Sequence, residues 1–222
     1  MAYGNSSYAN QLLFPKPTGA GLYVGIGISA WVGVVALLGA AEVFVAPPET
    51  PPAAVVLAVA APVISFLGAF WASDRIRKLV LGLDLCFLTA IQAWRMGGRS
   101  FLALYTYGIL PGYFAWPAGL GDMAVGLSAP WIILALTRRP AFAAGNTFLA
   151  WNIFGILDLV IAIAMGGFGP RFFSDHVLGA DATAPMSYMH LVLVPAFFVP
   201  LFIILHLAAL FQARRLANEI RS

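Results

Sequence analysis

Six apolar runs, each about long enough to cross a lipid bilayer, constrain this sequence more than any other feature. They cover approximately residues 21–45, 53–72, 79–94, 117–136, 147–165 and 188–211. A transmembrane helix needs about 20 predominantly apolar residues to cross the hydrocarbon core. Because short polar loops separate these runs, the sequence predicts an all-α protein, a bundle of six transmembrane helices.

The overall composition excludes a soluble or disordered chain. Hydrophobic residues make up 61% of the sequence and charged residues 9%, and the mean hydropathy is +0.90. Soluble domains carry about 25% charged residues. We therefore divide the chain into a polar cytoplasmic N-terminal segment (1–20), a six-span transmembrane domain (21–212) and a basic cytoplasmic tail (213–222).

A further uncharged run, residues 101–115, lies between the third and fourth apolar runs. It contains Gly108, Pro111 and Gly112, and no loop separates it from the fourth run. Its aromatic side chains are of the kind that concentrates at membrane–water interfaces. We interpret it as an interfacial or re-entrant segment between helices 3 and 4.

The distribution of lysine and arginine predicts the orientation. Six spans with a cytoplasmic N-terminus put nine basic residues inside: Lys16, Arg75, Arg77, Lys78, Arg138, Arg139, Arg214, Arg215 and Arg221. Three, Arg95, Arg99 and Arg171, are then outside. This bias predicts that both termini are cytoplasmic. The basic residues lie in short loops and form no continuous basic face, so the expected partner is the lipid bilayer and not a nucleic acid.

Ionisable residues inside the apolar runs are the candidate functional residues. A charged side chain at the bilayer centre costs about 2.5–3.5 kcal/mol on insertion scales, so each one needs an explanation. Counting along the runs gives an outer layer and an inner layer. The outer layer contains Glu42, Asp122, Asp158 and His190, and the inner layer contains Asp84 and His206.

The two outer aspartates are expected to lie side by side. Asp122 shares a helical stripe with Ala118 and Gly126, and a similar small-residue stripe accompanies Asp158. Stripes of small residues face other helices and not lipid. The fourth and fifth runs are consecutive and antiparallel, so the two carboxylates should approach each other. Ionising both would be unfavourable unless a cation or His190 compensates.

This pattern supports a binding site for a small solute, proton or cation in the outer half of the bundle. Asp122 and Asp158 are its central carboxylates, and Asn152, His190 and Glu42 are further candidates. Asp84 and His206 would form a secondary inner site. The alternative is a structural or accessory subunit of a membrane complex, in which the aspartates accept hydrogen bonds and lock helices together. The sequence leaves a homo-oligomer and a complex partner equally open.

The sequence identifies no metal site and no cofactor. His190 and His206 lie on one predicted helix about 24 Å apart, which is too far for both to ligate one haem iron.

A short motif gives a third alternative. Gly119-Leu120-Gly121-Asp122 resembles the G-x-G-D motif of intramembrane aspartyl proteases such as the presenilin group. Leu83-Asp84 stands where those enzymes have Tyr-Asp, and Pro195-Ala196-Phe197 stands where they have Pro-Ala-Leu. The resemblance implies an aspartate dyad of Asp84 and Asp122. A dyad needs its carboxylates close enough to share a proton.

The second half of the chain also resembles a set of small bacterial inner-membrane proteins with no established activity. The shared features are Trp116-Pro117-Ala118-Gly119 with Gly121-Asp122, Trp151-Asn152 with Gly155 and Asp158-Leu159-Val160, and Val194-Pro195 with Val199-Pro200-Leu201 and Leu205-His206-Leu207. The resemblance implies a multi-pass protein of the bacterial inner membrane and transfers no mechanism.

Overall fold

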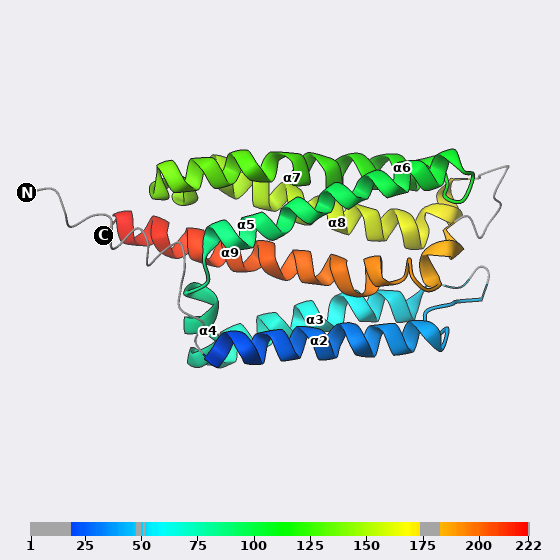
Figure 1. The fold of residues 1–222 in the computed structure, drawn as a ribbon, viewed down its shortest axis with the longest axis horizontal. Helices are drawn as coiled ribbons and strands as arrows, with labels where there is room; N and C mark the ends of the chain where they lie inside the picture. Colours follow the sequence, from blue (N-terminus) through cyan, green and yellow to red (C-terminus); the bar gives the residue numbers. More distant parts are fainter. Residues whose placement is uncertain (1–18, 48–49, 51, 174–182, 222) are drawn as a thin grey trace, which may run out of the picture.

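The computed structural model describes residues 19–47, 50, 52–173 and 183–221, and the regular secondary structure in this part of the chain is all helical. Long helices run side by side along one axis, as Figure 1 shows. The first turn of α2 and the last turn of α9 lie at the same end of the bundle (Figure 1). Most of the predicted N-terminal segment 1–20 lies outside the described residues.

The helices follow the chain in this order: α2 (Gly19–Ala40), α3 (Ala53–Ala72), α4 (Asp74–Leu81), α5 (Leu85–Ile91), the 3-10 helix η1 (Gln92–Gly98), α6 (Arg99–Thr106), α7 (Gly112–Arg138), η2 (Pro140–Ala144), α8 (Asn146–Phe172), η3 (Ala184–Ser187), the π-helical turn η4 (Val194–Phe198) and α9 (Val199–Arg221).

Five of these helices are long and apolar enough to cross a membrane: α2, α3, α7, α8 and α9. The count rises to six if α4 and the helical stretch 85–106 (α5, η1 and α6), which are bent by 79° relative to each other, form one broken span together. The described residues therefore fit a multi-pass membrane protein built as a helical bundle.

The predicted third span, residues 79–94, has the wrong boundaries. Its first residues belong to α4, which ends at Leu81, and the next helix begins after Asp84. The Asp84 carboxylate accepts a hydrogen bond from the Phe87 N–H at 2.7 Å, so it is the N-cap of α5. A short carboxylate at this position satisfies an N–H that lacks a helical partner. The spanning helix then continues through Arg95 to Thr106 because this arginine is buried and paired.

The structure does not set the predicted interfacial or re-entrant segment 101–115 apart as one element. Residues 101–106 belong to the same helical stretch as Arg95, and residues 112–115 form the first turn of α7. Only 107–111 form a connection, in which Gly108 has a positive φ of 67° and Pro111 precedes the next helix. The left-handed conformation of Gly108 reverses the chain at little cost.

Small residues bring α7 against η1. A Cβ on Gly98 would overlap the Cβ of Asp122 and lie 3.1 Å from the Gly119 carbonyl oxygen. A Cβ on Gly126 would lie 2.6 Å from the backbone nitrogen of Met96. The stripe of α7 that contains Ala118, Asp122 and Gly126 therefore packs on η1. The neighbouring helix α8 approaches α7 at a different position, Gly121. In contrast, Gly21, Gly25 and Gly33 of α2 have no neighbouring atom within 4 Å of an added Cβ.

The two ends of the bundle differ in charge. We call the end that carries α4, η2 and the last turns of α9 the basic end. Among the residues whose side chains the structure describes, seven at this end are basic: Arg75, Arg77, Lys78, Arg138, Arg139, Arg214 and Arg215. The connections 41–47, 107–111 and 183–193 lie at the opposite end (Figure 1).

Candidate functional site

The side chain of Arg95 is the centre of the site. It projects from η1 into the bundle and is fully buried, with a relative side-chain exposure of 0%. The described part of the chain supplies partners for it from three other helices. A guanidinium group has five N–H donors and no acceptor, so each partner must offer an acceptor.

Both predicted aspartates bind this guanidinium group. Its Nε donates to Oδ1 of Asp122 on α7 at 2.7 Å, and its Nη2 donates to Oδ2 of Asp158 on α8. Its Nη1 donates to the Gly155 carbonyl oxygen at 3.1 Å and to Nε2 of His206 on α9 at 3.2 Å. The expected proximity of the two carboxylates is therefore met, and a cation compensates their charge. That cation is Arg95, which the sequence placed in an outer loop.

The hydrogen bonds continue from His206 to a predicted helper residue. Since arginine can only donate, His206 Nε2 accepts from it and carries no proton. The proton of the neutral ring is then on Nδ1, which donates to Oδ1 of Asn152 at 2.9 Å. The Asn152 amide in turn donates to the Phe148 carbonyl oxygen at 2.9 Å. This chain of bonds fixes the histidine tautomer and the orientation of the amide.

Two glycines have no side chain where the polar groups of the cluster lie. A Cβ on Gly121 of α7 would overlap the carboxylate of Asp158, and a Cβ on Gly155 of α8 would overlap the ring of His206. At these positions the helix backbones come close enough for the polar groups to meet. The cluster thus depends on small residues in the helices that face it.

Both aspartates of the cluster lie well inside their helices. Asp122 is about 15 Å along α7 from the opposite end, and Asp158 is about 20 Å along α8 from that end, at 1.5 Å per residue. These depths approach the middle of two 27-residue helices. Polar groups this far from water need internal partners, which the arginine and the carboxylates supply to each other.

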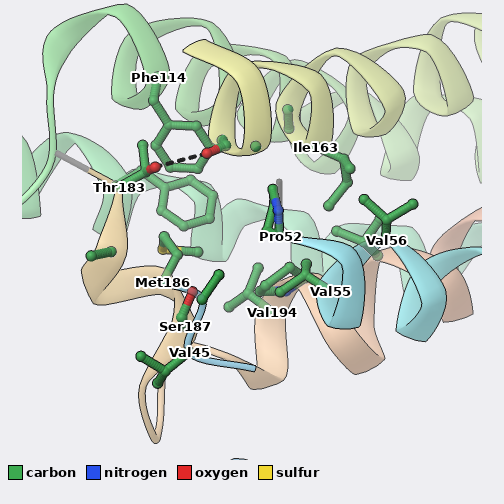
Figure 2. A pocket seen from close by; sticks show the side chains of 18 of the residues that line it. Val45, Pro52, Val55, Val56, Phe114, Ile163, Thr183, Met186, Ser187 and Val194 are labelled. Atoms are coloured by element: carbon green, nitrogen blue, oxygen red, sulfur yellow. Dashed lines mark hydrogen bonds between the residues drawn. The ribbon is translucent and has the colours of Figure 1, made fainter. Parts of the chain in front are cut away.

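A cavity of about 500 Å³ extends from the cluster toward the opposite end. Its walls come from α3, α7, α8, η4 and the residues before and after them. Figure 2 shows how Val55, Phe114, Ile163 and Val194 line it, with the hydroxyl of Thr183 donating to the Gly166 carbonyl oxygen at 2.7 Å. Asp122 is its only charged lining residue among the described residues. The Asp122 side chain is 16% exposed, compared with 8% for Asp158.

The structure does not bring the remaining predicted residues into the cluster. His190 is exposed in the approach to η4. Glu42 is exposed and adopts a positive φ of 56° in the turn that ends α2. The secondary inner pair is wrong, because Asp84 caps α5 whereas His206 binds Arg95. Asp84 lies about 16 Å along the helix from Arg95, so it makes no dyad with Asp122.

Sequence reasoning missed Arg95 and the carbonyl of Gly155. A basic residue beside a predicted helix end is usually a loop residue, and only its pairing identifies it as buried. A usable signal was Gln92, one turn earlier, because both polar residues fall on one helical face. Gln92 is buried and donates to the Phe202 carbonyl oxygen at 3.3 Å, and its Oε1 lacks a partner within the described residues.

Comparison with known proteins gives one match. Residues 52–214 match a family profile described as a domain of unknown function (DUF8737). No curated protein and no solved structure matches the chain. The matched residues contain the Arg95 cluster and most of the cavity wall.

Proposed function

The chain belongs to this family, whose description assigns no activity, and from the geometry of its site we propose that the protein binds a small, positively charged solute at Asp122. The observation that carries the proposal is the cavity of about 500 Å³ in which Asp122 is the one charged lining residue among those described. Transport of that solute across the membrane is the activity this arrangement supports best.

The charge of the cluster favours a cation. With both carboxylates ionised, the cluster sums to −1, since the guanidinium supplies one positive charge and the neutral His206 adds nothing. An uncompensated charge away from water is unfavourable. One further positive charge would neutralise the cluster. Asp122 is the one residue of the cluster that lines the cavity, so a cation in the cavity would bind there.

The second oxygen of Asp122 has the capacity to accept from a ligand. Oδ1 accepts from Arg95, whereas no hydrogen bond to Oδ2 occurs among the described residues. A carboxylate has about four acceptor positions. Asp122 can therefore hold Arg95 and a solute together, with α7 kept in place by the arginine.

Asp122→Asn should abolish the response to a cation. With the full chain in micelles, we expect methylammonium chloride to raise Tm when it replaces N-methylglucamine chloride at constant ionic strength. A ligand that binds only the folded state stabilises that state. Asp122→Asn should lose this rise. Asp158→Asn is the matched control. It also removes one carboxylate charge that pairs with Arg95, but Asp158 does not line the cavity. It should weaken the rise without abolishing it. No rise in the unmodified protein would contradict the proposal.

A structural or accessory subunit is the second candidate function. The observation that favours it is that Arg95 binds groups on three other helices. One guanidinium joins η1 to groups on α7, α8 and α9. Such a cluster would fix the relative positions of four helices without any solute. On this candidate both Asn variants lower Tm, and methylammonium has no effect on any of the three proteins.

We also propose that the basic end is cytoplasmic, in the inner membrane of a bacterium. The seven basic residues at that end support this orientation. Reporter fusions after Arg139 and after Ser222 should both give a cytoplasmic signal, and a fusion after Gly108 should give an external one. A cytoplasmic signal after Gly108 would contradict the orientation and the six-span count together.

A further inference from the structure

The lining of the cavity specifies the kind of cation that it accepts. Among the described residues the walls are mainly aliphatic and aromatic, from α3, α7, α8 and η4. Asp122 is the one charged lining residue among those described, and Thr183 and Ser187 bring hydroxyl groups on one side (Figure 2). A pocket of this composition binds a ligand with an apolar body and a small number of placed polar groups.

A bare metal ion does not fit this lining. Ca²⁺ takes six to eight oxygen ligands and Mg²⁺ requires six. In the described part of the chain, no group of three or more His, Cys, Asp or Glu residues is placed to hold a metal ion. The cavity offers one carboxylate, and Thr183 already donates its proton to Gly166. The ligand must therefore carry its own apolar surface in place of a hydration shell.

Two aromatic rings add to the apolar surface of the cavity. Phe101 and Phe114 both line the cavity and are both buried, and their ring centroids are 5.5 Å apart in an edge-to-face arrangement. Phe114 lies eight residues before Asp122 on α7, about 12 Å along the helix, so these rings offer contacts to the apolar body of the ligand and not to its charge.

We propose that this cavity binds an amphipathic organic ammonium ion, with its charged nitrogen at Oδ2 of Asp122 and its apolar body between Val55, Ile163 and Val194. This inference rests on the proposed cation site and adds the class of its ligand. The volume of about 500 Å³ lies within the range of pockets that enclose drug-sized molecules.

Three probes that share a phenyl ring and the same chain length but differ in charge test whether the ligand must be a cation. Phenylbutylamine, phenylbutanol and phenylbutyrate are titrated into the full chain in phosphatidylcholine nanodiscs, with Tm as the readout. The amine should bind at least about tenfold more tightly than the alcohol, since a hydrogen bond to a charged group is worth more than a neutral one. The carboxylate should bind most weakly. Equal affinity for amine and alcohol would overturn the assignment of an ammonium ion.

A pair of variants on α8 tests the cavity without changing a charge. Ala162 lines the cavity, whereas Ala164 is exposed on the same helix and does not line it. Ala162→Phe should lower the affinity for phenylbutylamine at least about tenfold, because the added ring occupies the space of the ligand's body. Ala164→Phe should leave it unchanged. An unchanged affinity in Ala162→Phe would overturn the location.

Methylammonium separates the failure of this inference from that of the cation site. We expect phenylbutylamine to bind at least about tenfold more tightly than methylammonium, because each buried CH₂ contributes about 0.8 kcal/mol. If methylammonium acts through Asp122 and phenylbutylamine binds no more tightly, the apolar ligand class is wrong and the cation site stands. If neither probe depends on Asp122, both proposals are wrong.

Discussion

Replacing Arg95 with methionine is expected to lower the free energy of unfolding by about 3–5 kcal/mol, which is the usual cost of removing one partner from a buried ion pair. Methionine keeps the length and apolar stem of the side chain but leaves two carboxylates in the interior with no cation. It also removes the donors to the Gly155 carbonyl and to His206. Equilibrium unfolding in micelles by increasing fractions of dodecyl sulfate measures the change.

Arg99→Met is the matched control for this variant. Arg99 lies one turn further along the same helical stretch and is exposed, and the structure records no ion pair for it among the described residues. Its substitution should change the free energy of unfolding by no more than about 0.5 kcal/mol, as is usual for surface sites. Equal effects of the two substitutions would show that Arg95 is not the centre of a buried cluster.

Restoring neutrality should recover part of the lost stability. In the triple variant Arg95→Met, Asp122→Asn, Asp158→Asn, no formal charge remains in the cluster, so the buried carboxylates no longer oppose folding. We expect it to be more stable than Arg95→Met alone. If the triple variant is less stable than the single one, the cost comes from packing and not from uncompensated charge.

Gly98→Ala is the second substitution with a large expected effect. The added methyl group would overlap the Cβ of Asp122 and press on the Gly119 backbone, neither of which is the flexible end of a side chain. Overpacking of this kind costs about 1–3 kcal/mol. The substitution should also reduce the response to methylammonium, because it displaces Asp122 from Arg95. Thermal unfolding with and without the ligand measures both changes.

The neighbouring glycine supplies the control. Gly97 is exposed, and a Cβ there would have no atom within 4 Å. Gly97→Ala should therefore be neutral or stabilise the helix by up to about 1 kcal/mol, since alanine loses less conformational entropy than glycine. If Gly98→Ala behaves like Gly97→Ala, η1 and α7 do not approach each other as closely as the structure indicates.

Most of the membrane architecture could be predicted from the sequence because it depends on local composition. A run of about 20 apolar residues specifies a spanning helix wherever its neighbours lie. The second run, 53–72, coincides with α3, and the fourth and fifth lie within α7 and α8. Asp122 and Asp158 do meet, but through Arg95 and not through facing small-residue stripes, since the Asp122 stripe packs on η1.

The third span could not be predicted because its boundaries depend on a partner elsewhere in the chain. Hydropathy treats Arg95 as the end of a span, since an unpaired arginine in lipid is costly. In the folded protein the cost is offset by carboxylates on two other helices. The same pairing brings His206 and Asn152 into the cluster, whereas Asp84 binds locally at the end of a helix.

By itself, therefore, the sequence determined that the chain is helical, that it has several helices able to cross a membrane, and that Asp122 and Asp158 lie within two of them. Only the tertiary structure decided which cation compensates those carboxylates, how deep the cluster lies, and that Asp122 rather than Asp158 faces a cavity. The physical reason is the range of the interactions. Helix formation and partitioning into lipid depend on about 20 consecutive residues. A buried charge depends on groups brought within about 3 Å of it from distant parts of the chain.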